Sequence, residues 1–558
     1  MTTSGGKKKL TSVKAGTVKS TKSKSISKAP SNNVLLTWGP MALLGITVLL
    51  VLILRLRLLQ IPMERDEAGF AYIGHWLLRG KSLYIDMVDN KLPGLYSLYA
   101  LFTTLFGYQS IGVHLGLLLA NVVSSVCLYY LIRDLYTKNI AIFASTFFAL
   151  LMISANVSGF AAHATQLLMP FVMGGWLLFF KGLRTEKKYL FLLSGLLLGS
   201  AFMIKQQSVV FSILAAILWW PARLAWNKST DKKLPILEYV LLGIGGFIPV
   251  VVTLIYFSMT NRLDQLVFWT YSQPASMAAT FNLTRWQLFA SSFPKILKDF
   301  QLLWLLAGAG IIISFLSGQK KIAAWFGVLM FILGLGSVVI GAAFYNHYFV
   351  LALPGVALLA AVTLNYVQEK AGNSGAIISL IGAGVLVLWP VIKQTDYYLQ
   401  PNYITIHQKI YNQMFPEIEK IGEELSRRVK EGDHIGVMGS EPGVLVSADR
   451  FGCSKHIFMY PMLSDPEKSP PLQKEFEVEI KNCMPEYIIW NTVSGSWTGG
   501  YEGLQMFRDL MIWIQENYTT TGIAEFRANA PGVIVWDADV QSLQSQSDQK
   551  VYVFQRKG

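Results

Sequence analysis

The sequence predicts a polytopic α-helical membrane protein with about eleven membrane-spanning helices, followed by a water-exposed α/β domain at its C-terminal end. Of its 558 residues, 53% are hydrophobic and only 15% are charged, and the mean hydropathy is +0.41. A chain of this composition needs a bilayer as its solvent. The hydrophobic residues gather in runs long enough for membrane helices up to about residue 395, and the sequence then becomes polar.

The basic N-terminal segment explains part of the formal net charge of +14. Eight lysines, from Lys7 to Lys28, stand among Ser, Thr and Gly, so the segment 1–33 is expected to be a disordered cytoplasmic tail. The other basic residues fall largely in short loops between apolar runs. This distribution indicates membrane topology, and no nucleic-acid partner is expected.

The apolar runs alternate with loops whose charge sets the orientation. Cytoplasmic loops are enriched in Lys and Arg, and placing the tail inside puts the basic loops 133–138, 181–188, 223–233, 319–321 and 368–374 on that side. An odd number of spans then places the C-terminus outside. Lys205 lies between the two shortest apolar runs, which are counted as separate spans. Arg55 and Arg57 are expected to snorkel from the end of the first helix to the membrane surface. The predicted spans are 34–59, 111–132, 139–156, 160–180, 189–204, 207–221, 236–257, 299–317, 322–343, 348–365 and 375–393.

The C-terminal segment 396–558 is expected to fold as a separate extracytoplasmic α/β domain after the membrane domain 34–395. Alternating helical and strand-like patterns predict it. The turn 439–443 is not a nucleotide fingerprint, so nothing supports a soluble sugar-nucleotide donor. Three cysteines are too few for a disulfide scaffold. Helices are expected at Phe415–Lys430 and Met506–Asn517, and strands at His434–Met438, Val444–Ser447, Ile457–Tyr460, Tyr487–Asn491, Val533–Trp536 and Val551–Phe554.

The first outside loop, residues 61–107, carries the densest chemistry. Five acids and four bases lie between Glu64 and Lys91, directly after a membrane span. Apolar residues at helical spacing predict two amphipathic helices on the membrane surface, at Ala68–Leu78 and Leu92–Phe106. They would hold Asp66 and Lys91 at the bilayer interface, where both interact with charged lipid head groups. The alternative is a solvated loop whose charges pair with one another.

The charged loop also resembles a known family. Its pattern is similar to the first extracytoplasmic loop of C-type glycosyltransferases (GT-C), above all the bacterial protein O-mannosyltransferase and lipid A aminoarabinose transferase group. A second likeness lies in a late helix, and the whole resemblance spans about residues 40–395. The matching segments are Arg65-Asp66-Glu67 with Tyr72, Arg79-Gly80 with Tyr84 and Asp86, Asp89-Asn90-Lys91-Leu92-Pro93-Gly94, and Tyr345-Asn346-His347-Tyr348-Phe349 with Leu353-Pro354-Gly355, and weaker likenesses lie at Ala162–Gln166 and Lys205-Gln206.

The resemblance implies a transfer of sugar from a polyprenyl-phosphate carrier to an acceptor hydroxyl on the extracytoplasmic side. It implies that Asp66 is the general base, since a carboxylate can take the proton of the attacking hydroxyl. Glu67, the other acid of the pair, is expected to orient the loop. The donor phosphate needs compensating charge and hydrogen-bond donors. The expected phosphate-binding residues are Lys91, His347, Tyr348 and Arg65.

Four further residues are expected to support the site or bind the acceptor: Asp86, Asp89, His163 and Lys205. Polar groups at membrane depth are candidates for function by default, although a hydrogen bond between helices is an equal alternative for His163 and Lys205. Lipid A aminoarabinose transferases have an acid where this chain has Asn90. No cofactor is required by this interpretation, no Cys/His cluster has zinc spacing, and a divalent metal is not excluded.

Two other classes of function remain open from the sequence. A secondary transporter or lipid flippase would predict inverted repeats and charged residues at the bilayer midplane, whereas the charges here concentrate outside. A non-catalytic envelope scaffold would leave the acidic loop unexplained. The expected location is the plasma (inner) membrane of a bacterium, with membrane lipids and a protein, lipid or glycan acceptor as partners.

Overall fold

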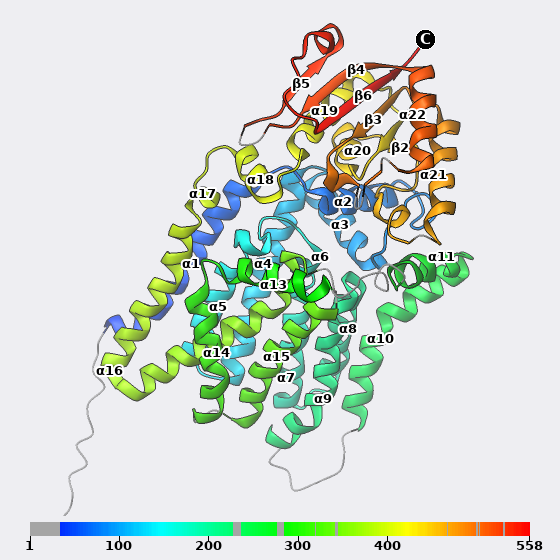
Figure 1. Cartoon of the computed structure of the whole chain (residues 1–558). Coiled ribbons are helices and arrows are strands. Elements are labelled where there is room, and N and C mark those ends of the chain that lie inside the picture. The colour runs from blue at the N-terminus through cyan, green and yellow to red at the C-terminus, as the bar shows by residue number, and fades with distance from the viewer. Residues whose placement is uncertain are drawn as a thin grey trace, which may run out of the picture.

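The computed structural model describes residues 34–226, 236–275, 284–317, 320–340, 344–465, 467–497, 500–501, 503–527 and 530–558. The predicted tail 1–33 therefore lies outside the described residues. Figure 1 shows a bundle of long helices with the α/β domain, coloured yellow to red, across one end. The helices α2 (Arg65–Leu78) and α3 (Pro93–Phe106) lie between the bundle and this domain.

Every predicted apolar run forms helix in the bundle, although the boundaries move by several residues. The bundle helices are α1 (Val34–Leu58), α4 (Ser110–Leu135), α5 (Lys138–Leu151), α6 (Ala164–Leu167), α7 (Met169–Thr185), α8 (Tyr189–Ile204), α9 (Val209–Trp226), α10 (Ile236–Met259), α14 (Gln301–Leu316), α15 (Lys321–Ile340) and α16 (Leu353–Lys393). The segments α11 (Leu263–Val267), Phe268–Ser272 and α13 (Thr284–Leu297) lie between α10 and α14.

The number of helices that can cross a bilayer is smaller than the predicted eleven. In the described part of the chain, seven helices are long and apolar enough, or up to eight if a pair bent by 104° near residue 300 counts as one span. The helices α5 and α8 have 14 and 16 residues, shorter than the roughly 20 that a hydrocarbon core requires. The last two predicted spans both lie within the segment 346–393, which counts once in this number although its backbone breaks at Gly372.

Two breaks in the backbone explain how the predicted spans are divided. Lys205 is extended, with φ −154° and ψ 121°, and separates α8 from α9. Gly372 has φ 56° and ψ −131°, which interrupts α16 and is accessible to glycine because it lacks a Cβ atom. The hydroxyl of Ser379 donates to the carbonyl of Leu364 at 2.7 Å. The two halves of α16 therefore pack side by side as a hairpin.

The C-terminal domain contains a six-stranded mixed sheet, which has the strand order β2-β1-β3-β6-β4-β5. The strand β1 pairs in parallel with β2 and β3, and the remaining pairs are antiparallel. The strands are β1 (His434–Met438), β2 (Phe451–Gly452), β3 (Tyr487–Asn491), β4 (Tyr518–Glu525), β5 (Val533–Trp536) and β6 (Lys550–Arg556). The helices are α17 (Thr395–Tyr398), α18 (Tyr403–Tyr411), α19 (Phe415–Arg428), α20 (Pro442–Ala448), α21 (Ser469–Cys483) and α22 (Gln505–Asn517).

Two predicted strands of this domain are wrong. Residues 444–447 form part of α20, because Pro442 occupies a favoured position in the first helical turn and the apolar side chains pack against α19. Residues 457–460 form a loop that enters a 3₁₀ turn at Tyr460. Both segments are short runs of buried apolar residues. Such a run lacks a periodicity that would distinguish a strand from other buried structure. The strand β4 and the helix α21 were not predicted.

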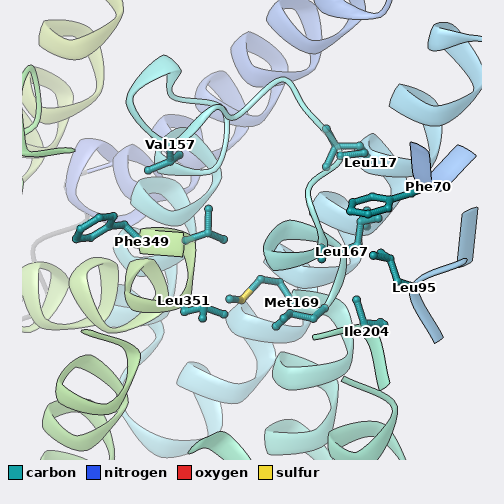
Figure 2. Packing of buried hydrophobic residues seen from close by; sticks show 14 of the residues in the cluster. Phe70, Leu95, Leu117, Val157, Leu167, Met169, Ile204, Phe349 and Leu351 are labelled. Carbon is teal, nitrogen blue, oxygen red and sulfur yellow. The ribbon is translucent and has the colours of Figure 1, made fainter. Parts of the chain in front are cut away.

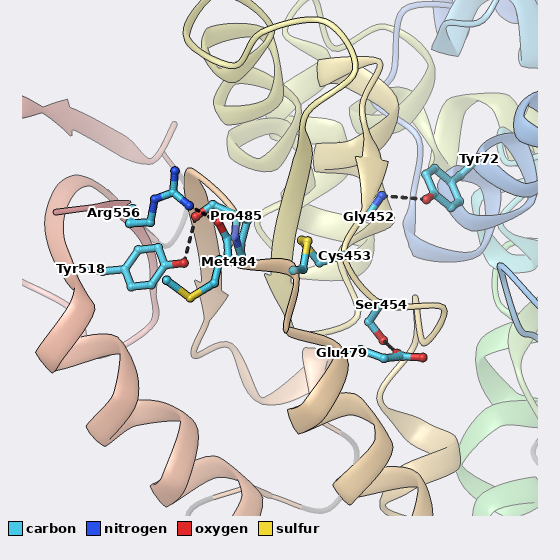
Figure 3. Close-up of a disulfide and its surroundings, with 10 residues drawn as sticks. Tyr72, Gly452, Cys453, Ser454, Glu479, Met484, Pro485, Tyr518 and Arg556 are labelled. Atoms are coloured by element: carbon cyan, nitrogen blue, oxygen red, sulfur yellow. Dashed lines mark hydrogen bonds between the residues drawn. A yellow bond between two sulfur atoms is a disulfide. The ribbon is translucent and has the colours of Figure 1, made fainter. Parts of the chain in front are cut away.

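A disulfide joins Cys453, just after β2, to Cys483 at the end of α21, with Cα atoms 5.7 Å apart. Figure 3 shows it close to the hydrogen bond in which the Gly452 amide donates to the Tyr72 hydroxyl of α2 at 2.9 Å. Sequence reasoning from the cysteine count did not predict this link. It fastens the part of the α/β domain that contacts α2.

One buried apolar cluster runs through both parts of the molecule. It includes Phe70 and Tyr72 of α2, bundle residues such as Leu167, and Phe458 and Ile488 of the α/β domain. Figure 2 shows side chains from the bundle, α2 and α3 meeting in this core. The α/β domain is thus packed onto the helices that carry the charged loop.

Candidate active site at the bundle end

The charged loop is held by two helices with well-defined starts. In α2, Glu64 is the N-cap: its side chain accepts from the amide of Glu67, and the Glu67 side chain accepts from the amide of Glu64. This reciprocal pattern is a capping box, which satisfies amides that a helix start leaves free. In α3, which the sequence predicted at Leu92–Phe106, Pro93 stands in the first turn, a position that favours proline.

Asp66 lies in the first turn of α2 and faces two histidines from distant parts of the chain. His163 directly precedes α6, and His347 lies in the 3₁₀ segment Asn346–Ala352 that leads into α16. The two imidazole rings stack with centroids 3.8 Å apart. A carboxylate oxygen of Asp66 and one nitrogen of each ring all lie within 4.8 Å of one another.

Two lysines adjoin this cluster. Lys91 precedes α3, and Lys205 lies in the break between α8 and α9. The charges of Lys91 and Asp66 both act on Lys205. Gly94 explains how the two lysine segments meet, because a Cβ atom there would lie 2.7 Å from the backbone oxygen of Met203. A glycine lets the first turn of α3 touch the end of α8.

Lys205 is buried, with 6% of its surface exposed. Its ammonium lies 4.0 Å from the centre of the Tyr348 ring, a cation–π contact. Burial, assisted by the charge of Lys91, lowers the pKa of Lys205 to about 7, against the opposing effect of Asp66. The charge of this lysine is therefore sensitive to pH near neutrality.

Glu67 points away from Asp66 into the protein. It is completely buried and accepts a hydrogen bond from the amide of Ala162 at 2.5 Å, and it lies 3.1 Å from His114 Nε2 of α4. Burial alone would raise the pKa of Glu67, but His114 and the Ala162 amide hold it below its usual value. Because Ala162 is next to His163, Glu67 fixes the segment that carries this histidine.

The other predicted site residues lie around the edge of the cluster. Asp89 is buried and accepts from the hydroxyls of Tyr96 at 2.8 Å and Tyr460 at 2.5 Å. Asp86 accepts from the amide of Ser82 at 2.6 Å and supports the turn of the loop. Arg65 is directed to the α/β domain, where it pairs with an acid far away in the sequence.

The expectation that Arg55 snorkels is wrong. It is 4% exposed, and its guanidinium donates to the carbonyl oxygens of Gly159 at 2.6 Å and Met152 at 2.9 Å. Two carbonyls of the segment before His163 provide partners that the sequence could not show. Arg57 is exposed and reaches the carbonyl of Gln400 at 3.4 Å.

Sequence reasoning assigned no role to Glu64, although it lies beside the site. Its Oε1 is 3.7 Å from Nδ1 of His163. The other ring nitrogen of His163, Nε2, lies 3.4 Å from the Tyr411 hydroxyl. Burial raises the pKa of Glu64 well above its usual range, and the charges of Asp66 and Glu67 add to this effect. The spacing Glu64-x-x-Glu67 before an apolar helix was the available signal, with Glu in place of the usual Ser or Thr.

The arrangement combines a carboxylate, two ammonium groups and stacked imidazoles at the end of the bundle. A carboxylate can accept a proton, and the cations can stabilise a phosphate. Asp66, His163 and His347 also form a donor set of one carboxylate and two imidazoles that could hold a divalent metal such as zinc. The sequence did not predict this set, because its members come from three separate segments of the chain.

Residues 90–253 match the family described as dolichyl-phosphate-mannose-protein mannosyltransferase. The matched segment is under a third of the chain and contains Lys91, His163 and Lys205, whereas Asp66 and His347 lie outside it. None of the curated proteins matches this sequence.

Solved structures show the same fold. ArnT from Cupriavidus metallidurans bound to undecaprenyl phosphate aligns with a TM-score of 0.55 and 12% identity, over 88% of this chain and 97% of that one. ArnT from the same organism in the apo state aligns with a TM-score of 0.51 and 11% identity, over 88% and 98%. The oligosaccharyltransferase AglB from Archaeoglobus fulgidus aligns at 0.46 and 12%, over 90% and 75%, which is too weak to support an argument.

The matched segment and the shared fold confirm the predicted resemblance: residues 90–253 are similar to the mannosyltransferase family, and the chain has the fold of ArnT.

Proposed function

We propose that the chain transfers a sugar from its polyprenyl-phosphate carrier to a hydroxyl group of an acceptor, with Asp66 as the general base. The observation that carries this proposal is the cluster itself. A half-buried carboxylate, two lysines and two imidazoles converge from five segments of the chain at the end of the bundle that the α/β domain covers.

In the proposed reaction, the acceptor hydroxyl attacks the anomeric carbon of the donor while its proton passes to a carboxylate oxygen of Asp66. The bond between the anomeric carbon and the phosphate oxygen breaks, and polyprenyl phosphate leaves with both bonding electrons. Glu67 takes no part in this proton transfer, because its carboxylate is engaged with Ala162 and His114. Its part is to keep α2 and the His163 segment in place.

The leaving phosphate would be stabilised by Lys91 and Lys205. Lys91 stands just before the start of α3, where free amides and the positive end of the helix dipole favour an anion. His347 and Tyr348, whose ring Lys205 contacts, can add hydrogen bonds. Arg65 is a weaker candidate for this role than the sequence suggested, since its guanidinium is already bonded to the α/β domain.

The proposed location of the reaction is the extracytoplasmic face of a bacterial plasma membrane. The basic loops support this orientation, and the Cys453–Cys483 disulfide supports an oxidising compartment for the α/β domain. In a Cys127→Ser background, a cysteine placed at Ser20 should react with an impermeant thiol reagent only after cell lysis. Labelling of that cysteine in intact cells would reverse the orientation.

The function can be tested with the purified full chain in nanodiscs. Undecaprenyl-phosphate mannose is offered with membranes of the source organism as acceptor, and formation of undecaprenyl phosphate and mannosylated product is followed. Sugar transfer that needs the acceptor membranes supports the proposal. Movement of the intact mannolipid between leaflets of reconstituted vesicles, without cleavage, would instead identify a flippase.

A further inference from the structure

The turn after β1 in the α/β domain binds Arg65, the residue next to Asp66. Arg65 Nε donates to the carbonyl oxygen of Ser440 at 2.6 Å, and its Nη2 donates to Glu441 Oε1 at 2.9 Å. The guanidinium also lies over the ring of Phe415, 5.3 Å from its centre. Arg65 is thus held from three sides by a domain that follows the whole membrane bundle in the chain.

This turn is itself held by hydrogen bonds within the α/β domain. The Ser440 amide donates to Ser496 Oγ at 2.8 Å, and Ser440 Oγ donates to the carbonyl of Ser496 at 2.9 Å. The amide group of Asn491, at the end of β3, donates to Glu441 Oε1 at 2.7 Å. Only 2% of the Glu441 side chain is exposed. This carboxylate is therefore held by Asn491 as well as by Arg65.

The location of the turn in the sheet is informative. The strands β1 and β3 are parallel, and the turn 439–443 and Asn491 stand at their carboxyl ends. This is the edge at which α/β sheets usually bind their ligands. Here the edge holds a side chain of the same protein, the arginine next to the proposed base.

A second contact from the same domain reaches the lysine side of the site. The Tyr460 hydroxyl donates to Asp89 Oδ1 at 2.5 Å, and the Val88 amide donates to the carbonyl of Lys455 at 3.0 Å. Asp89 stands two positions before Lys91. The α/β domain therefore contacts the chain next to both charged groups of the proposed reaction.

We propose that Glu441 and Tyr460 are positioning residues of the glycosyltransferase: the α/β domain sets the places of Asp66 and Lys91 through Arg65 and Asp89. The inference rests on the proposed function, since it gives the domain a part in that reaction. It also explains why this domain is joined to α2 by a continuous buried core.

The same helix offers a matched control at its other end. Asp449 of the α/β domain pairs with Arg79 at 2.8 Å and with His75 at 3.1 Å, about three turns away from Asp66. This pair is exposed, with 43% of Arg79 and 46% of Asp449 accessible. If the domain only adheres to α2, loss of either pair should have the same kind of effect.

The test compares Glu441→Gln with Asp449→Asn in the full chain, in the mannolipid transfer assay. We expect Glu441→Gln to lower kcat about tenfold or more, because small displacements of a catalytic group have large effects on rate. The KM for undecaprenyl-phosphate mannose should stay near that of the wild type, and Asp449→Asn should retain wild-type kcat. Equal kcat values for the two variants, at equal thermal stability, would overturn the proposal.

Two further measurements keep the test decisive if Glu441→Gln fails to fold. Tyr460→Phe removes a single hydroxyl, and we expect it to raise the KM for the mannolipid several-fold, through displacement of Lys91; an unchanged kcat/KM would overturn the proposal. If Glu441→Gln folds, adding it to Arg65→Gln should cause no further loss of kcat, since both act through one contact. An additive loss would contradict the route through Arg65.

A failed positioning role can be distinguished from a failed function. Wild-type transfer with unaffected Glu441 and Tyr460 variants removes only this inference. A wild-type protein that does not transfer the sugar removes the proposed function as well.

Discussion

Asp66 and Glu67 are adjacent acids on one helix, and the protein places them in opposite surroundings. Asp66 is half-buried beside two histidines and near two lysines, whereas Glu67 is fully buried and saturated with hydrogen bonds. Successive residues of a helix point about 100° apart, so neighbours cannot serve one site equally. Both side chains are carboxylates, so their positions on the helix, and not their chemical type, make Asp66 the proposed base and Glu67 a structural residue.

The largest effect is expected from Asp66→Asn. The substitution keeps the shape of the side chain and removes the proton acceptor, so transfer should fall by about 10²-fold or more, the usual scale for general-base catalysis. Binding of undecaprenyl phosphate and the melting temperature should stay near their wild-type values. Transfer at the wild-type rate would exclude Asp66 as the base.

A chelator distinguishes the two roles open to Asp66. If it accepts a proton, EDTA treatment of the wild-type protein should leave transfer unchanged. If Asp66, His163 and His347 hold an essential divalent cation, transfer should disappear with EDTA and return when zinc or another divalent ion is added. The second result would replace the general-base mechanism.

The next largest effect is expected from Lys91→Ala. A hydrogen bond to a charged group is worth about 1.5–3 kcal/mol, so the Kd for undecaprenyl phosphate should rise about tenfold or more. Lys91→Arg should recover part of the affinity, because it restores the charge but not the compact shape of the ammonium. The fold should be unaffected, since α3 starts at Pro93. An unchanged Kd would move the phosphate site to Lys205, His347 and Tyr348.

The membrane domain was largely predictable because its signals are local. Runs of apolar residues gave the positions of the membrane helices, and amphipathic spacing gave α2 and α3. Span counting was less successful. The breaks at Lys205 and near Gly372 fell where the sequence predicted them, but α5 and α8 are shorter than a hydrocarbon core requires. How such short helices are accommodated depends on packing against their neighbours.

The residues that hold the site were not predictable in the same way. Glu441 reaches Arg65 across 376 positions, and Tyr460 reaches Asp89 across 371. Neither residue belongs to a motif, and neither lies in the segment that resembles the glycosyltransferases. Pairing over such distances follows from the tertiary fold alone, whereas Asp66 and Lys91 could be proposed from the loop pattern.

A smaller effect is expected from pH, through Lys205. With a pKa of about 7, its ammonium is charged below neutrality and loses its charge above it. The affinity for undecaprenyl phosphate should therefore fall several-fold between about pH 6 and pH 8.5, and bound phosphate should move the midpoint upward. In Lys205→Met this pH dependence should disappear. A pH-independent Kd in the wild type would remove Lys205 from the phosphate site.

The stability of the free protein should change in the opposite direction. Burial lowers the pKa of Lys205 from its ordinary value of 10.5 to about 7, so between these values the unfolded chain binds the extra proton. The contribution of this group to stability then rises with pH across that window. Comparing the melting temperatures of wild type and Lys205→Met at pH 6.5 and 8.5 isolates the contribution.

The smallest effect on catalysis, and the sharpest test of the opening comparison, is expected from Glu67→Gln. The amide keeps an oxygen for Ala162 but loses the charge opposite His114, and breaking a buried ionic contact typically costs about 3 kcal/mol or more. The variant should therefore melt at a lower temperature, while kcat at a temperature where it is folded should stay within about threefold of the wild type. His114→Gln should give a similar loss of stability, and the double variant should be less destabilised than the sum of the two, because both remove one contact. Stability is measured by thermal unfolding in nanodiscs and kcat by mannolipid transfer on the same samples. A fall in kcat as large as that of Asp66→Asn, with stability intact, would mean that Glu67 shares the proton transfer, and the division of labour between the two acids would be wrong.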